Sequence, residues 1–322
     1  MWAPAQAWDR FALPSWKESD VAASIAVFVV RRNDAATADP ADSGLMLAEG
    51  GTSGGTVRGE ARALADALNG RGLECSVRFS SAEGGHSGCF VYQAASRTTA
   101  SVVFQYRPDG TVIGLAIKVR GTGETGAALR SLTGTVGPIL FAADLPRVNT
   151  ALSEWGGWVD GSWGGFQIVS RGPKTEVSGA KLGSTQIKVP VLHLDTTEAE
   201  LADGLGADGY TCTADHETCQ GKYAGQPGLA LKFSGPDTGI TYLVATAATA
   251  ATSSNAFEQL QTTVFGHLKG GAVAPIKGWV AQHLDGRSHV AYVAGWRVDL
   301  EVATGKQTRL TLFNEEIWLV MS

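Results

Sequence analysis

EARALADALNGRGLEC (Glu60–Cys75) and TEAELADGLGADGYTC (Thr197–Cys212) are two stretches of one chain that align with each other without a gap. Each is predicted to form a helix that leads into a cysteine-bearing strand. Six of the sixteen aligned positions are identical, namely Leu64/Leu201, Ala65/Ala202, Asp66/Asp203, Leu68/Leu205, Gly72/Gly209 and Cys75/Cys212. Because self-similarity at a fixed period marks a repeated structural unit, we infer that the fold is a duplicated module.

The likeness between the two copies continues after these cysteines. Each copy next carries a His-x-x-Cys segment, which ends at Cys89 in the first copy and at Cys219 in the second. Each then has an extended run containing a Pro-Asp pair, in FQYRPDGTVIGL (104–115) and in LKFSGPDTGITYL (231–243). A proline followed by Asp and Gly favours a turn, so we predict a hairpin at each place.

Two helices and two strands are predicted to complete each copy. The clearest helix is SSNAFEQLQTTVFGHLKGG (253–271), which has apolar residues on one face and a capping-box pattern at Asn255 and Glu258. Its counterpart is TGAALRSLTGTVG (125–137), and a second helix begins near a proline in each copy. The predicted strand pairs are GGFQIVSRG (164–172) with TQIKVPVL (185–192), and WRVDLEVATG (296–305) with QTRLTLF (307–313).

The predicted fold class is therefore α+β, with two tandem pseudo-repeats of order α-β-β-β-β-α-α-β-β. Each repeat is expected to form an antiparallel sheet with its helices packed on one face. We place the repeats at residues 58–195 and 196–322, after an N-terminal extension and linker at 1–57. The apolar run SIAVFVV (24–30) in that extension is a candidate for one added strand.

The composition argues against two classes of partner. Of the 322 residues 44% are apolar and 18% are charged, and the net charge is −5 with the 26 basic residues scattered along the chain. An acidic chain without a basic cluster gives no reason to expect nucleic-acid binding. The longest apolar run near the N-terminus is too short to span a bilayer, so we expect no membrane span.

The four cysteines allow two readings. Two thiolates with His86 or His216 between them could ligate zinc. The alternative is one disulfide in each copy, Cys75 with Cys89 and Cys212 with Cys219, which staples the hairpin of the first two strands. The spacing changes from 14 to 7 residues between the copies. A disulfide between adjacent strands tolerates this change and a metal site does not, so we favour disulfides, with no metal and with both histidines exposed on turns.

A glycine-rich segment offers an alternative site. GTGETGA (121–127) has the spacing of a dinucleotide-binding turn, and Asp144 follows 18 residues after Gly126. The strand before it, however, is the second arm of a hairpin, and its Lys118 and Arg120 alternate outward. The second copy has no glycines at the matching place, so we expect a flexible connection and no cofactor.

Three tryptophans lie in SEWGGWVDGSWGGF (153–166), a glycine-rich stretch that also contains acidic residues. They are either core residues or a platform for a flat ligand. We take Trp158, Trp163 and Arg120 as the candidate binding residues, at a crevice between the copies. His193, His267, His283 and His289 have no evident nucleophile partner, and we interpret Glu315 and Glu316 as surface residues.

The sequence shows none of the common catalytic motifs, and paired cysteines are typical of an oxidising compartment. We therefore predict a non-enzymatic, extracytoplasmic or secreted protein that binds an unknown protein or small ligand. Export would use a leader that is not in this sequence, or another route. Two alternatives stay open: an enzyme or metal-binding protein that uses the His-x-x-Cys segments or the Gly121–Gly126 loop, and a structural subunit of an envelope or virion assembly.

Overall fold

The computed structural model describes residues 57–93, 98–121, 125–154, 156–170, 172–248, 253–303 and 307–315. All of them belong to one structural unit, Pro40–Ser322. The added strand predicted at 24–30, the tryptophan at 155 and the glutamate at 316 lie outside the described residues.

Two halves of similar construction follow each other along the chain. The first half contains α2 (Gly59–Asn69), β1 (Glu74–Ser81), β2 (Gly84–Gln93), β3 (Thr98–Tyr106), β4 (Val112–Gly121), α3 (Thr125–Leu140), α4 (Leu145–Glu154), β5 (Gly156–Asp160), β6 (Gly164–Val169) and β7 (Lys174–Lys181). The second half contains α5 (Glu198–Ala207), β8 (Thr211–Cys212), β9 (Thr218–Tyr223), β10 (Gln226–Ser234), β11 (Tyr242–Ala247), α6 (Ser253–His267), α7 (Val273–Gln282), β12 (His289–Val293), β13 (Trp296–Ala303) and β14 (Gln307–Phe313).

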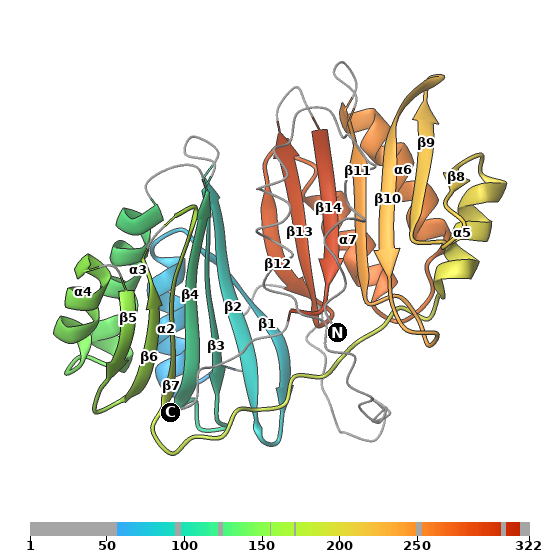
Figure 1. The fold of residues 1–322 in the computed structure, drawn as a ribbon. Coiled ribbons are helices and arrows are strands. Elements are labelled where there is room, and N and C mark those ends of the chain that lie inside the picture. Colours follow the sequence, from blue (N-terminus) through green and yellow to red (C-terminus); the bar gives the residue numbers. More distant parts are fainter. Residues whose placement is uncertain are drawn as a thin grey trace, which may run out of the picture. The chain divides into compact units, whose positions relative to one another are not determined.

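Each half forms one antiparallel sheet of seven strands among the described residues. The strand order is β1-β2-β3-β4-β7-β6-β5 in the first half and β8-β9-β10-β11-β14-β13-β12 in the second, so the two sheets share one topology. Figure 1 shows the helices of each half packed on one face of its own sheet. The predicted α+β class with two similar halves is confirmed, whereas the repeat boundaries at 58–195 and 196–322 stay a prediction.

The predicted order of elements is short by one strand in each half, because three strands follow the second helix. In the first half, β7 pairs with the central strand β4, from Gly114↔Ala180 to Arg120↔Lys174. Its sequence, KTEVSGAK, holds few of the β-branched and aromatic residues that mark a strand, so it was missed.

The strand predicted at 185–192 is wrong, since this segment has no strand pairing. There the backbone of Ile187 is hydrogen-bonded by a side chain, not by the backbone of a neighbouring strand. The Gln105 amide donates to the carbonyl of Ile187 at 2.8 Å and accepts from its N–H at 2.9 Å. These two hydrogen bonds hold the segment beside β3, although it is not a strand of the sheet.

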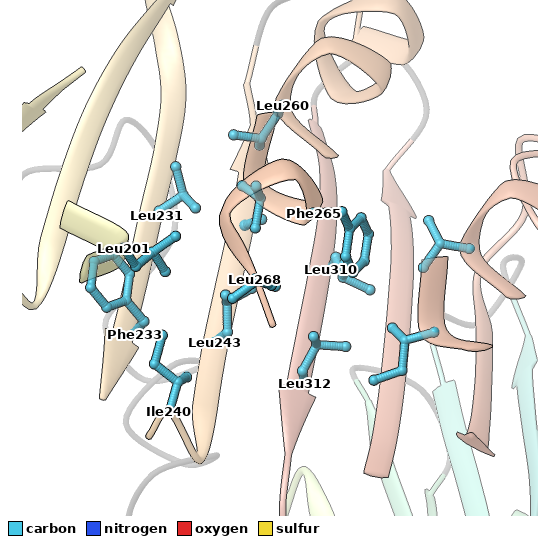
Figure 2. Packing of buried hydrophobic residues seen from close by; sticks show 14 of the residues in the cluster. Leu201, Leu231, Phe233, Ile240, Leu243, Leu260, Phe265, Leu268, Leu310 and Leu312 are labelled. Atoms are coloured by element: carbon cyan, nitrogen blue, oxygen red, sulfur yellow. The ribbon is translucent and has the colours of Figure 1, made fainter. Parts of the chain in front are cut away.

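The core of each half lies between its sheet and its helices. In the second half this layer is built from residues of α5, α6, α7 and the inward-facing strand positions. Figure 2 shows part of it, including Leu201, Leu231, Phe233, Leu243, Phe265, Leu310 and Leu312. Burying one such side chain contributes about 1.5–3 kcal/mol, so this layer is the main source of stability.

Helix starts differ from the sequence prediction in one respect. α6 begins at Ser253, so Asn255 lies inside the helix and cannot be its N-cap. A complete capping box occurs at α5, where Thr197 Oγ1 accepts from the N–H of Glu200 at 3.2 Å. The Glu200 carboxylate accepts from the N–H of Thr197 at 2.9 Å in return.

Both disulfides are present at corresponding places. Cys75 faces Cys89 across β1 and β2, and Cys212 faces Cys219 across β8 and β9. In each half the sulfur of the first cysteine lies 3.5 Å from a carbonyl oxygen of the preceding helix, that of Ala65 or of Ala202. The aligned stretches therefore have the same local geometry. Each of the four sulfurs is bonded to its partner cysteine, so none is left as a thiolate that could bind a metal.

Candidate functional site

The helix-free face of the first sheet carries a cluster of charged side chains, which we call the cationic cluster: Lys118, Arg120, Lys174 and Glu176. Residues directly opposite each other in an antiparallel pair have their side chains on one face. Lys118 pairs with Glu176, and Arg120 pairs with Lys174, across β4 and β7. The cluster thus places three cations beside one carboxylate.

Glu176 serves both lysines of the cluster. Its carboxylate lies 3.8 Å from the Lys118 amine and 3.7 Å from the Lys174 amine. The guanidinium of Arg120 forms no hydrogen bond or ion pair with any described residue. Positive charge therefore exceeds negative charge at this point of the sheet.

Arg120 is partly buried, and its surroundings disfavour its charge. Burial lowers the pKa of Arg120, and the nearby guanidinium of Arg297 lowers it further. Glu315, Asp299 and Glu176 act in the opposite direction but are too weak to reverse the shift. A cation that is desolvated, lacks a partner and faces a second cation gains from an anion more than an exposed arginine does.

Trp158 lies on the same face as Arg120. It opposes Gln167 across β5 and β6, and Glu176 opposes Val169 on the next pair of strands. Its side chain is 46% exposed and its indole N–H donates to Asp160 at 2.6 Å, which fixes the ring. Across the sheet, Trp158 is in register with Ala116 on β4, which is four residues from Arg120. Three strand spacings (about 14 Å) and this offset along the strand (about 13 Å) together separate Trp158 from Arg120 by about 19 Å.

Trp163 lies apart from the other two candidate residues. It is only 8% exposed and packs against Phe141 and Phe166, with ring centroids 6.0 and 5.4 Å away. It belongs to the core beneath the helices. The structure therefore brings Arg120 and Trp158 to one face and places Trp163 on the other side of the sheet.

A cavity of about 460 Å³ lies next to Trp163, lined by Leu140, Phe141, Ala142, Ala143, Ser162, Trp163, Lys181 and Leu182. The adjoining Asp144 accepts from the backbone N–H groups of Ser162 at 2.8 Å and of Trp163 at 2.7 Å. Burial would raise the pKa of Asp144, but these hydrogen bonds outweigh burial and lower it. Asp144 thus has a structural role here and is not free for a ribose hydroxyl.

A buried polar network joins the two halves. β1 and β2 contact β12, where the N–H of Tyr292 donates to Ser76 Oγ at 2.8 Å and the ring of Tyr292 meets Phe90 at 5.2 Å. The hydroxyl of Tyr292 donates to the Glu315 carboxylate, which also accepts from Arg297 at 3.0 Å. From the first half, Arg78 donates to the carbonyls of Gly295 and Glu315.

His86 is a fully buried member of this network, like Arg78 and Tyr292. Its Nε2 lies 3.2 Å from the Tyr292 hydroxyl. Because that hydroxyl donates its one hydrogen to Glu315, His86 Nε2 must be the donor. Its Nδ1 is buried without a hydrogen-bond partner among the described residues, which disfavours a second proton on the ring. Burial, and then the charge of Arg78, lower the pKa of His86 to about 3.

Glu315 is the anion that balances the cations of the network. Burial alone would raise its pKa, but Arg297, and after it Lys118, outweigh burial and lower the pKa to about 2. The same carboxylate, together with Asp299, raises the pKa of Arg297 against the effect of burial. The charges of the network are thus held fixed over the ordinary pH range.

Two sequence expectations are corrected by this network. His86 was expected on an exposed turn, yet it lies within β2 and is 0% exposed. Glu315 was expected at the surface, yet it is 6% exposed. Their partners lie up to 237 residues away, so no local pattern could have revealed them. His216, by contrast, lies on an exposed turn as predicted, with a φ of 60°.

The glycine-rich loop is the alternative site that the sequence offers. The central residues of the Gly121–Gly126 loop lie outside the described residues. None of the described helices is both long and apolar enough to cross a bilayer.

Comparisons with models of protein families, with curated proteins and with solved structures found no match to this chain.

Proposed function

We propose that this chain is an extracytoplasmic, non-enzymatic binding protein that holds an anionic ligand at the cationic cluster. The observation that carries the proposal is the state of Arg120, a partly buried guanidinium without a hydrogen-bond partner among the described residues, beside the guanidinium of Arg297. A carboxylate, sulfate or phosphate group would satisfy its donors and offset its charge.

The surroundings of Arg120 support the same chemistry. Lys118 and Lys174 share one carboxylate, and each ammonium has three donors, so Glu176 alone does not satisfy both groups. Trp158 supplies an exposed and fixed ring on the same face, suited to stacking on a flat or sugar-like part of the ligand. A ligand that used both would extend over about 19 Å, diagonally across three strand spacings.

The proposed location rests on the cysteines. All four are paired within the described residues, and structural disulfides persist in oxidising compartments. The proposal of a binding protein, rather than an enzyme, rests on the nature of the cationic cluster. It contains cations and an aromatic ring nearby, but no nucleophile with an adjacent general base.

Isothermal titration with phosphate, sulfate, citrate and a sulfated oligosaccharide tests this function. We expect at least one of these probes to bind, with an affinity that falls as salt is raised. Arg120→Gln should weaken that binding about 10-fold or more, since a hydrogen bond to a charged group contributes about 1.5–3 kcal/mol.

Arg130→Gln is the matched control, because Arg130 is an exposed arginine on α3, away from the helix-free face. It should bind the probe as the unchanged protein does. The proposal fails if no probe binds, or if Arg120→Gln and Arg130→Gln bind equally well.

A further inference from the structure

A second group of chemically reactive side chains lies away from the cationic cluster. Glu74, His283 and His289 each present one ligand atom, and these three atoms lie within 4.8 Å of one another. Glu74 begins β1 in the first half, His283 follows the end of α7, and His289 begins β12. No local sequence pattern reveals this group, because Glu74 is more than 200 residues from the histidines.

The ring of His283 is already oriented. Its Nδ1 lies 2.7 Å from the carbonyl oxygen of Trp279, and the ring stacks on the indole of Trp279 with centroids 4.3 Å apart. A carbonyl can only accept a hydrogen bond, so Nδ1 carries the hydrogen. The lone pair of His283 is therefore on Nε2, which is the nitrogen left for a ligand.

The ring of His289 is oriented in the complementary way. Its Nε2 donates to Asp285 Oδ1 at 2.8 Å, and Asp285 is itself held by the N–H of Arg287 at 2.9 Å. This leaves Nδ1 of His289 with the lone pair. A carboxylate behind a histidine is the usual outer partner of a metal-binding imidazole, because it fixes the tautomer and raises the basicity of the ligand nitrogen.

Two imidazole nitrogens and one carboxylate form a donor set that suits zinc, with water as the fourth ligand. Zinc binds such atoms at about 2.0–2.2 Å, which puts neighbouring ligand atoms about 3.4 Å apart. The separations of up to 4.8 Å need only a small inward movement. Glu74 is exposed and His283 is partly exposed, so both side chains have room for that movement.

We propose that Glu74, His283 and His289 bind one Zn²⁺ ion, which links the first half of the protein to the second. The backbone around the site supports this role without the ion. Two residues after Glu74, Ser76 accepts a hydrogen bond from the N–H of Tyr292, so β1 is already held beside β12. Zinc would add a cross-link at the start of this contact.

Zinc titration of the disulfide-intact, untagged chain tests the proposal. Competition against a chromophoric chelator should give one Zn²⁺ per chain, and the melting temperature should rise with zinc concentration. Glu74→Gln and His283→Gln should each weaken zinc binding more than about 10-fold, since even loss of an outer-shell partner costs about 10–100-fold. Cobalt in place of zinc should give the visible absorption of a tetrahedral site, reduced in both variants.

His193→Gln serves as the control, because His193 is a partly exposed histidine beside a carboxylate, that of Asp195 at 3.8 Å, and is outside the proposed site. It should bind zinc as the unchanged chain does. Far-ultraviolet circular dichroism of each variant shows whether it is folded. The absence of stoichiometric zinc, or equal affinity in all four proteins, would overturn the site. Loss of zinc in His283→Gln with full affinity in Glu74→Gln would overturn the link between the halves.

Discussion

The two cysteine hairpins of this protein start alike and end differently. In the first half, β1 and β2 have 8 and 10 residues, whereas β8 and β9 have 2 and 6. The longer hairpin carries Arg78 and His86 past the disulfide and into contact with the second half. The shorter one ends in an exposed turn at His216.

This difference shows which part of the module is free to vary. A disulfide fixes the base of each hairpin against the preceding helix, and the residues beyond it can be lengthened without disturbing the core. One copy uses this length to build a junction, and the other does not. The predictions that follow test whether the junction and the disulfides behave as this comparison requires.

The largest effect is expected at the junction itself. Glu315→Gln leaves the buried Arg297 without one of its two carboxylates, and breaking a buried charge pair costs about 3–5 kcal/mol of unfolding free energy. Glu301→Gln is the control, because Glu301 also binds an arginine, at 2.6 Å, but its side chain is 38% exposed. That variant should cost about 1 kcal/mol or less in urea unfolding. Equal costs would mean that the network does not stabilise the junction.

The two disulfides should differ in their contribution. The closed loops span 14 and 7 residues, and the chain-entropy relation gives about 3 and about 2 kcal/mol. The double variants Cys75→Ala/Cys89→Ala and Cys212→Ala/Cys219→Ala should lose stability in that order by urea unfolding. A greater loss in the second half would show that loop length does not set the difference.

Acid should lower the free energy of unfolding through a residue of the first hairpin, His86, and not through the second hairpin. The pKa of His86 falls from 6.5 to about 3 on folding, so between these values the unfolded chain binds a proton that the folded chain excludes. Stability therefore falls as pH drops below 6.5, by about 2 kcal/mol at pH 5 from this residue alone. The low pKa of Glu315 adds a loss in the same direction below pH 4.5.

Urea unfolding at pH 7.5 and pH 5 measures this effect. His86→Gln should make the difference between the two pH values smaller by about 2 kcal/mol. His216→Asn should leave it unchanged, because His216 is exposed and asparagine tolerates the positive φ. An unchanged pH dependence in His86→Gln would show that His86 is not neutral and buried in solution.

The smallest effect concerns the two edge strands that end the sheets. β5 and β12 have the same place in their sheets, but Val290 on β12 is 7% exposed and Trp158 on β5 is 46% exposed. Val290→Ala removes two buried carbons and should cost about 1.5 kcal/mol. Trp158→Ala should cost less than about 1 kcal/mol in thermal unfolding. A larger loss for Trp158→Ala than for Val290→Ala would mean that β5, and not β12, is the packed edge strand.

Much of the architecture can be predicted from the sequence, because short local patterns predict the elements of the repeat. The matches from Leu64 to Cys75 predicted the helix, the strand and the disulfide of both halves. β7 was missed because its residues have low strand propensity and it is held by its neighbours on both sides. Arg120 and Trp158 were named from sequence, but the separation of Trp163 from them was not foreseen. His86, Glu315 and the group around Glu74 could not be foreseen, because each depends on contacts between segments far apart in the chain.

The junction between the halves pairs unlike surfaces, β1 and β2 of one copy with β12 of the other. A joint of this kind is head-to-tail and has no two-fold axis, unlike the joint of a symmetric dimer. Because β8 has two residues, the second copy lacks the long hairpin that the first copy uses in this joint. The hairpin lengths thus give the joint a direction, because of the two copies the first one has the strands that reach β12.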